Sequence, residues 1–168
     1  ETKLLYSFIN DLIASKNLDQ QRLDPNQPND LETDKPTDKL KRTISQEAME
    51  TAIAASVRIQ DPSGSPMRVS GTIISEEGEI ATCAHHWFMP GTGVTVSLTD
   101  GRDVSAMVAG IGFPADISIV KILEPGPFPH VELGKSTEVR VGEPLVMIGY
   151  GPVDKNKHQP NARTVSVI

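Results

Sequence analysis

Residues 70–88 read SGTIISEEGEIATCAHHWF, and this stretch is the most informative about the fold. Two short runs rich in isoleucine and threonine lie on either side of the turn sequence Glu76-Glu77-Gly78. Such runs, bounded by glycine and polar turn residues, are typical of β-strands. The second run ends in a cysteine, two adjacent histidines and the only tryptophan of the chain. The stretch therefore predicts two strands, the second of which places imidazole groups at its end.

The same pattern continues on both sides of this stretch. Runs of valine, isoleucine and threonine alternate with turn residues about every ten positions, which is typical of an antiparallel barrel or sandwich. Asp100-Gly101 is a hairpin signal, and the sequence EPGPFP at 124–129 predicts an extended loop. We expect an all-β domain with strands at about 56–60, 67–75, 79–84, 93–99, 102–112, 116–123 and 144–149.

The first third of the chain has a different character. Residues 1–16 carry apolar side chains at helical spacing and predict an amphipathic helix that packs on its own domain or on a neighbouring subunit. Residues 17–43 are polar, include three prolines and predict a disordered linker. Thr43 and Gln46 form a capping-box pattern, so we expect a helix to open the domain at 44–168.

Composition excludes some partners. The chain has 168 residues, with 16 Lys and Arg against 22 Asp and Glu, which gives a formal net charge of −6. Nucleic-acid binding needs basic patches, so we expect no nucleic-acid partner. No apolar run approaches the ~20 residues that span a bilayer, and we expect no membrane span. Cys83 is the only cysteine, so no internal disulfide can form, which leaves the compartment open.

His85 and Asp116 are the candidates for chemistry. An imidazole at the end of a strand can act as a general base when a carboxylate fixes its tautomer and orientation. Asp116 precedes the apolar run ISIVKI at 117–122, and acids are rarely buried there without a partner. From the residues alone, Asp116 is either such a partner or a solvated turn acid. His85 is either a base, a core or surface histidine, or a metal ligand.

A zinc site at Cys83, His85 and His86 is the competing interpretation. Adjacent residues of a strand face opposite ways, and the sequence holds no second cluster with ligand spacing. We therefore expect neither a metal nor a cofactor. We expect Trp87 and Phe88 to be packing residues, and His130 and His158 to face solvent.

An ordered series of short motifs carries a family resemblance. The series is Ser70-Gly71, Gly78, Thr82, His85, Asp100-Gly101-Arg102, Asp116 through Lys121, Leu133-Gly134-Lys135-Ser136, Arg140-Val141-Gly142 and Ile148-Gly149. In this order and at these spacings it resembles the first half of the protease domain of HtrA/Deg-type trypsin-like serine proteases, over residues 56–168. The resemblance implies a six-stranded antiparallel barrel, followed by the beginning of a second barrel.

The resemblance also implies roles and partners. It places His85, rather than His86, as the general base and Asp116 as the acid that orients it. It implies a serine endopeptidase of the protein quality control class that needs no cofactor and acts on unfolded or peptide substrates. It further implies a homotrimer assembled through N-terminal segments and a periplasmic or secreted location. The sequence departs from the family pattern at Cys83, where the wider family has an alanine.

The family's nucleophile lies in a Gly-Asn-Ser-Gly-Gly segment of the second barrel, and this sequence has no such segment. Ser166 lacks flanking glycines and lies in an alternating apolar run at 163–168, which resembles the opening strand of that barrel. We therefore expect the serine to lie outside this chain, and the chain by itself to be inactive. The alternative is a catalytically inactive barrel that binds peptides or proteins.

Overall fold

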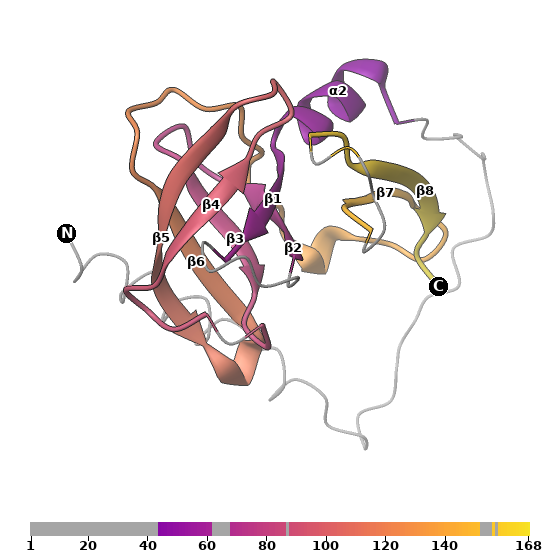
Figure 1. Cartoon of the computed structure of the whole chain (residues 1–168). Helices are drawn as coiled ribbons and strands as arrows, with labels where there is room; N and C mark the ends of the chain where they lie inside the picture. The colour runs from indigo at the N-terminus through magenta and orange to yellow at the C-terminus, as the bar shows by residue number, and fades with distance from the viewer. Residues whose placement is uncertain (1–43, 62–67, 87, 152–155, 157) are drawn as a thin grey trace, which may run out of the picture.

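The computed structural model describes residues 44–61, 68–86, 88–151, 156 and 158–168 (Figure 1). The predicted helix at 1–16 and the linker at 17–43 lie outside these residues. Within the described part of the chain, six strands form a closed barrel, two further strands form a separate sheet, and no helix is long and apolar enough to cross a membrane.

The barrel confirms the all-β prediction. Its strands are β1 (Ser56–Gln60), β2 (Arg68–Ile73), β3 (Glu79–Cys83), β4 (Gly93–Ser97), β5 (Asp103–Gly112) and β6 (Ile117–Ile122). Their order around the barrel is β1-β2-β3-β6-β5-β4, with β4 pairing back to β1, and every pair is antiparallel. Closure leaves no open edge strand in the barrel, and it brings β3 beside β6, which sequence order alone does not predict.

Alternation along the strands builds the core. In β5, Val104, Ala106 and Val108 are buried, whereas Ser105 and Met107 between them are exposed. The other strands contribute further aliphatic side chains to this core that are fully buried: Val57, Ile59, Ile73, Ile80, Val96 and Val120. Each such side chain stabilises the fold by about 1.5–3 kcal/mol relative to exposure. The barrel interior is therefore a packed core that holds its strand ends in fixed positions.

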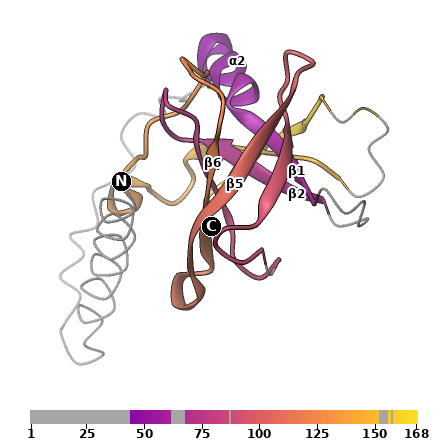
Figure 2. The same ribbon diagram turned by 60° about the vertical axis from the view of Figure 1, so that its left-hand side comes forward.

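In the part of the chain that the structure describes, the α-helix α2 (Gln46–Ala54) precedes β1 at one end of the barrel (Figure 2). Its N-cap is Ser45, whose Oγ accepts the backbone N–H of Ala48 at 3.1 Å. The predicted cap at Thr43 is therefore wrong. Ser45 caps instead because its hydroxyl lies three residues before an N–H that has no partner within the helix.

The last two strands, β7 (Pro144–Gly149) and β8 (Asn161–Ser166), form an antiparallel pair beside the barrel (Figure 1). The backbone N–H of Tyr150 donates to Ser70 Oγ at 2.8 Å, which connects this pair to β2. Burial raises the pKa of Tyr150 to about 12. His158 contacts Leu98 O through Nδ1 at 2.7 Å and is half-buried. The expectation that His158 faces solvent is wrong, because this contact holds it against the barrel.

Candidate active site

The register of β3 and β6 brings the two predicted residues together. Cys83, the last residue of β3, is opposite Ile117, the first residue of β6. His85 follows β3 by two residues, and Asp116 directly precedes β6 at the end of a 3-10 turn. Because the strands are antiparallel, the end of one meets the beginning of the other, and residues 31 positions apart in the sequence become neighbours.

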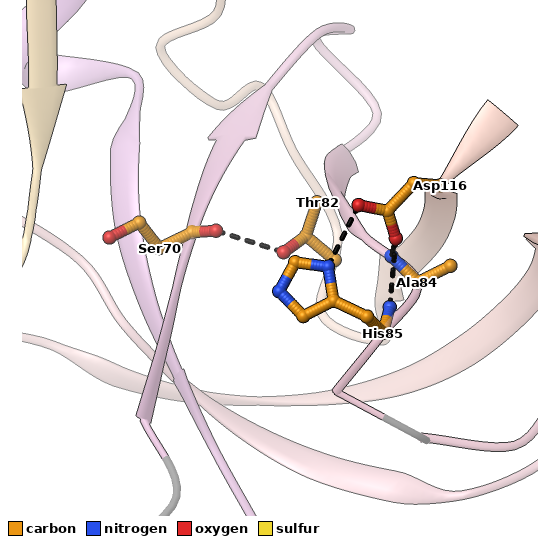
Figure 3. A network of polar contacts seen from close by, with 5 residues as sticks. All are labelled: Ser70, Thr82, Ala84, His85 and Asp116. Carbon is orange, nitrogen blue, oxygen red and sulfur yellow. Dashed lines mark hydrogen bonds and ion pairs between the residues drawn. The ribbon is translucent and has the colours of Figure 1, made fainter.

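Three N–H groups surround the carboxylate of Asp116 (Figure 3). Its Oδ2 lies 2.7 Å from His85 Nδ1. Its Oδ1 accepts the backbone N–H of Ala84 at 3.0 Å and that of His85 at 2.9 Å. These bonds fix the carboxylate plane and therefore the orientation of the imidazole ring. Asp116 adopts a left-handed backbone conformation with φ 52°, which aspartate tolerates better than most residues.

A further hydrogen bond supports β3, the strand that leads into the turn of His85. Thr82 Oγ1 donates to the backbone oxygen of Ser70 at 2.8 Å, which connects β3 to β2 (Figure 3). Ser70 thus accepts from Thr82 through its carbonyl and from Tyr150 through its hydroxyl. This residue joins the candidate site to the β7–β8 pair, a role that its place in the Ser-Gly motif does not reveal.

The electrostatics keep Asp116 ionised. The hydrogen bond from His85 is the largest cause that lowers the pKa of Asp116, and the two backbone N–H donors lower it further. Burial lowers the pKa of His86, and the neighbouring His85 lowers it further. The side chains of His85 and Asp116 remain 63% and 52% exposed, so the pair is open to a reactant or a partner from solvent.

This arrangement suits proton transfer. A carboxylate at Nδ1 holds the neutral imidazole in the tautomer that carries its proton on Nδ1. The lone pair of Nε2 then remains available to accept a proton. The geometry brings together both sequence-predicted site residues, His85 and Asp116. Sequence patterns cannot reveal the backbone donors of Ala84 and His85, because every residue except proline has such a donor.

Cys83 and His86 lie closer to His85 than the sequence analysis predicts. The potential ligand atoms of Cys83, His85 and His86 all lie within 4.8 Å of one another. The strand-alternation argument against this grouping is wrong, because β3 ends at Cys83 and both histidines lie in the turn that follows. Phe88 is buried in the barrel core, as predicted, whereas Trp87 lies outside the described residues.

Ser166, the serine that the sequence analysis rejects as a nucleophile, lies in the last strand that the structure describes. Ser166 lies on β8 opposite Pro144 and is exposed. It therefore belongs to the two-stranded sheet, whereas His85 and Asp116 lie at the ends of barrel strands.

Comparison with known proteins agrees with this geometry. Residues 69–167 match the family described as the trypsin-like peptidase domain. The chain belongs to this family. The match includes the barrel strands β2 to β6, the β7–β8 pair and both residues of the His85–Asp116 pair, whereas β1, which closes the barrel, precedes it.

Similar curated members of the family are HtrA and DegP proteases. The chain is 39% identical over 80 residues to "Serine protease HTRA1" of Xenopus laevis. It is 35% identical over 80 residues to "Probable periplasmic serine endoprotease DegP-like" of Bartonella henselae, and 37% identical over 81 residues to the protein of the same name of Halomonas elongata. Each alignment covers 48% of this chain but only 16% or 17% of the relative. The chain thus matches about a sixth of the length of these relatives.

Proposed function

We propose that this chain provides the base half of the active site of an HtrA-type serine endopeptidase. The observation that carries the proposal is the 2.7 Å contact between His85 Nδ1 and Asp116 Oδ2, on a barrel of the trypsin-like peptidase family. The chemistry is acyl transfer, and the roles of base and orienting acid belong to His85 and Asp116.

Each residue has a defined step. As a serine Oγ attacks the substrate carbonyl carbon, His85 Nε2 takes the hydroxyl proton. The imidazolium then gives this proton to the leaving amine, and water hydrolyses the acyl-enzyme by the same route. Asp116 stabilises the imidazolium and keeps Nε2 directed towards the nucleophile. No cofactor enters these steps.

The serine is proposed to come from a second barrel beyond residue 168. Support comes from the β7–β8 pair, which presents apolar side chains that the described residues leave exposed, including Leu145, Met147 and Val165. Apolar strand faces of this kind normally pack in a core. A second barrel that grows from this pair would cover them and would carry the nucleophile and the oxyanion-hole donors.

Substrates, assembly and location belong to the same proposal. Relatives are named serine proteases and periplasmic serine endoproteases, and we propose unfolded or peptide substrates and a periplasmic or secreted location for this protein. We further propose a homotrimer through residues 1–16. Light scattering of the chain with and without these residues tests the assembly, since an unchanged protomer number on their removal contradicts it.

Cleavage of an unfolded substrate tests the enzymatic proposal. The full-length product of the gene should degrade reduced, alkylated casein, and His85→Ala should abolish the cleavage while circular dichroism remains unchanged. His130→Ala is the matched control, because His130 is outside the His85–Asp116 pair and its Nδ1 contacts the carbonyl oxygen of Phe128. Binding of the unfolded substrate without any cleavage would instead favour the inactive binding barrel.

A further inference from the structure

We infer that Cys83, His85 and His86 form a binding site for a divalent transition metal of the zinc type. The site uses the same histidine as the proposed catalytic pair. Metal binding to His85 and base catalysis by His85 therefore exclude one another. The expected inhibition of the protease by the metal rests on the proposed function, whereas the metal site itself does not.

The geometry of the three residues is close to that of a metal site. Their potential ligand atoms, one from each residue, lie within 4.8 Å of one another. Around tetrahedral zinc, with Zn–N and Zn–S bonds of about 2.1 and 2.3 Å, neighbouring ligand atoms lie about 3.3–3.6 Å apart. Because the hydrogen bond to Asp116 fixes the His85 ring, rotation of the Cys83 and His86 side chains must close this difference. His85 and His86 lie in a turn with His85 exposed and His86 half-buried, and their ring centroids are 4.6 Å apart.

The donor set selects the class of metal. One thiolate and two imidazoles favour zinc, cobalt and copper over magnesium and calcium, which prefer oxygen ligands. Three protein ligands leave a fourth position for water in a tetrahedral site. On binding, the Cys83 thiol releases its proton to solvent and the thiolate coordinates the ion. Each histidine coordinates through a neutral ring nitrogen.

Asp116 adds an independent argument. Metal-bound histidines usually donate their second ring N–H to a carboxylate, which fixes the ring and raises its basicity. His85 already has this partner, since its Nδ1 lies 2.7 Å from Asp116 Oδ2. The same hydrogen bond that prepares Nε2 to accept a proton also prepares it to bind a metal. The His85–Asp116 pair is therefore suited both to proton transfer and to metal binding. The thiol of Cys83 supplies the further ligand that a metal site needs.

The expected consequence is reversible inhibition of the proposed protease by zinc. A metal on Nε2 occupies the lone pair that would accept the proton of the serine. Removal of the metal by a chelator restores the base. The sequence position that distinguishes this chain from the usual family pattern, Cys83, thus becomes the residue that gives the site its metal affinity.

Cobalt spectroscopy on the 168-residue chain tests the site without any need for catalysis. Titration with Co²⁺ should give a thiolate-to-cobalt charge-transfer band and tetrahedral ligand-field bands, with one ion bound per chain, and Zn²⁺ should displace the cobalt. Cys83→Ala should abolish the charge-transfer band. His86→Ala should weaken binding, and Asp116→Asn should weaken it on the order of 10- to 100-fold. His130→Ala, outside the cluster, should bind as the wild type does.

The outcomes separate the inference from the proposed function. Absence of the charge-transfer band, or cobalt binding that survives Cys83→Ala unchanged, overturns the metal site. If the band appears, Zn²⁺ should also block reaction of the full-length protein with a fluorophosphonate probe, and Cys83→Ala should relieve this block. Band formation with no probe reaction in metal-free protein would retain the metal site and overturn the proposed function. If zinc-saturated protein still reacts with the probe, the claim that metal binding and base catalysis use the same histidine, His85, is overturned.

Discussion

At the scale of the residue, Asp116 is the centre of the candidate site. Its two oxygens accept from His85 Nδ1 and from the backbone N–H groups of Ala84 and His85. One side chain thus holds both the imidazole and the turn that carries it. An asparagine at this position would keep the shape of the side chain and remove its charge, so the two contributions can be measured separately.

We expect Asp116→Asn to fold and to lose activity. The asparagine oxygen can still accept the backbone N–H groups, but the amide NH₂ favours the wrong imidazole tautomer. In the full-length protease, kcat should fall by a factor on the order of 10⁴. Steady-state cleavage of a peptide substrate, with circular dichroism as the fold control, measures the effect. A kcat within a few-fold of wild type would contradict the assigned role.

The stability of the folded chain should depend on pH through the ionisation of Asp116. The hydrogen bond from His85 lowers the pKa of Asp116 in the folded state, so its stabilisation is complete above the unfolded carboxyl range near roughly pH 4. It is lost as pH falls through the lowered folded pKa. The difference in melting temperature between wild type and Asp116→Asn should therefore shrink on acidification. Differential scanning calorimetry at several pH values checks this, and a constant difference contradicts it.

At the scale of the element, the packed core leaves no room for a side chain at Gly71 of β2. A Cβ on Gly71 of β2 would lie 2.6 Å from Ile80 Cγ2 and 3.0 Å from Ile59 Cδ1. Both neighbours are fully buried and have little room to move. The absence of a side chain at this position therefore leaves room for buried side chains of β1 and β3.

We expect Gly71→Ala to lower the free energy of unfolding by about 1–3 kcal/mol, the usual cost of overpacking a core. Gly93→Ala is the matched control, since its added methyl would meet no atom within 4 Å; it should change stability by less than about 0.5 kcal/mol. Urea denaturation of the two variants measures both effects. Equal stabilities would show that β2 shifts freely at this position.

The sequence predicts these elements well but not their partners. Alternation and turn residues are local signals, so the strands differ from prediction by at most two residues at their ends. The pairing of His85 with Asp116 depends on β3 meeting β6 across the closed barrel, which local patterns cannot reveal and which the family resemblance supplied. The sequence raises the grouping of Cys83 with His85 and His86 but strand alternation argues against it, and that argument does not apply because the strand ends at Cys83.

At the scale of the whole molecule, the β7–β8 pair and the barrel meet at a few polar contacts. Ser70 Oγ accepts from Tyr150 N, Tyr150 Oη lies 3.4 Å from Ser56 O, and His158 contacts Leu98 O. Ser70 also accepts the hydroxyl of Thr82 through its own backbone carbonyl, and this hydrogen bond supports β3. The pair is thus attached to the same strand that supports the site.

We expect Ser70→Ala to loosen the β7–β8 pair and leave the barrel intact. The Tyr150 N–H loses its acceptor, so amide hydrogen exchange in β7 and β8 should accelerate, while exchange in β3 and β6 should not change. Ser105→Ala, an exposed position on β5, is the control. Mass-spectrometric hydrogen exchange compares the variants, and uniform acceleration throughout the barrel would contradict a local role for Ser70.

Covalent labelling by a fluorophosphonate tests the central claim most directly, because only a serine activated by a base reacts with this probe. In the full-length protein, His85→Ala should abolish labelling and His130→Ala should retain it, and the labelled peptide should contain a serine beyond residue 168. Absence of labelling in the wild type, or undiminished labelling of His85→Ala, would contradict the assignment of His85 as the base of a serine protease.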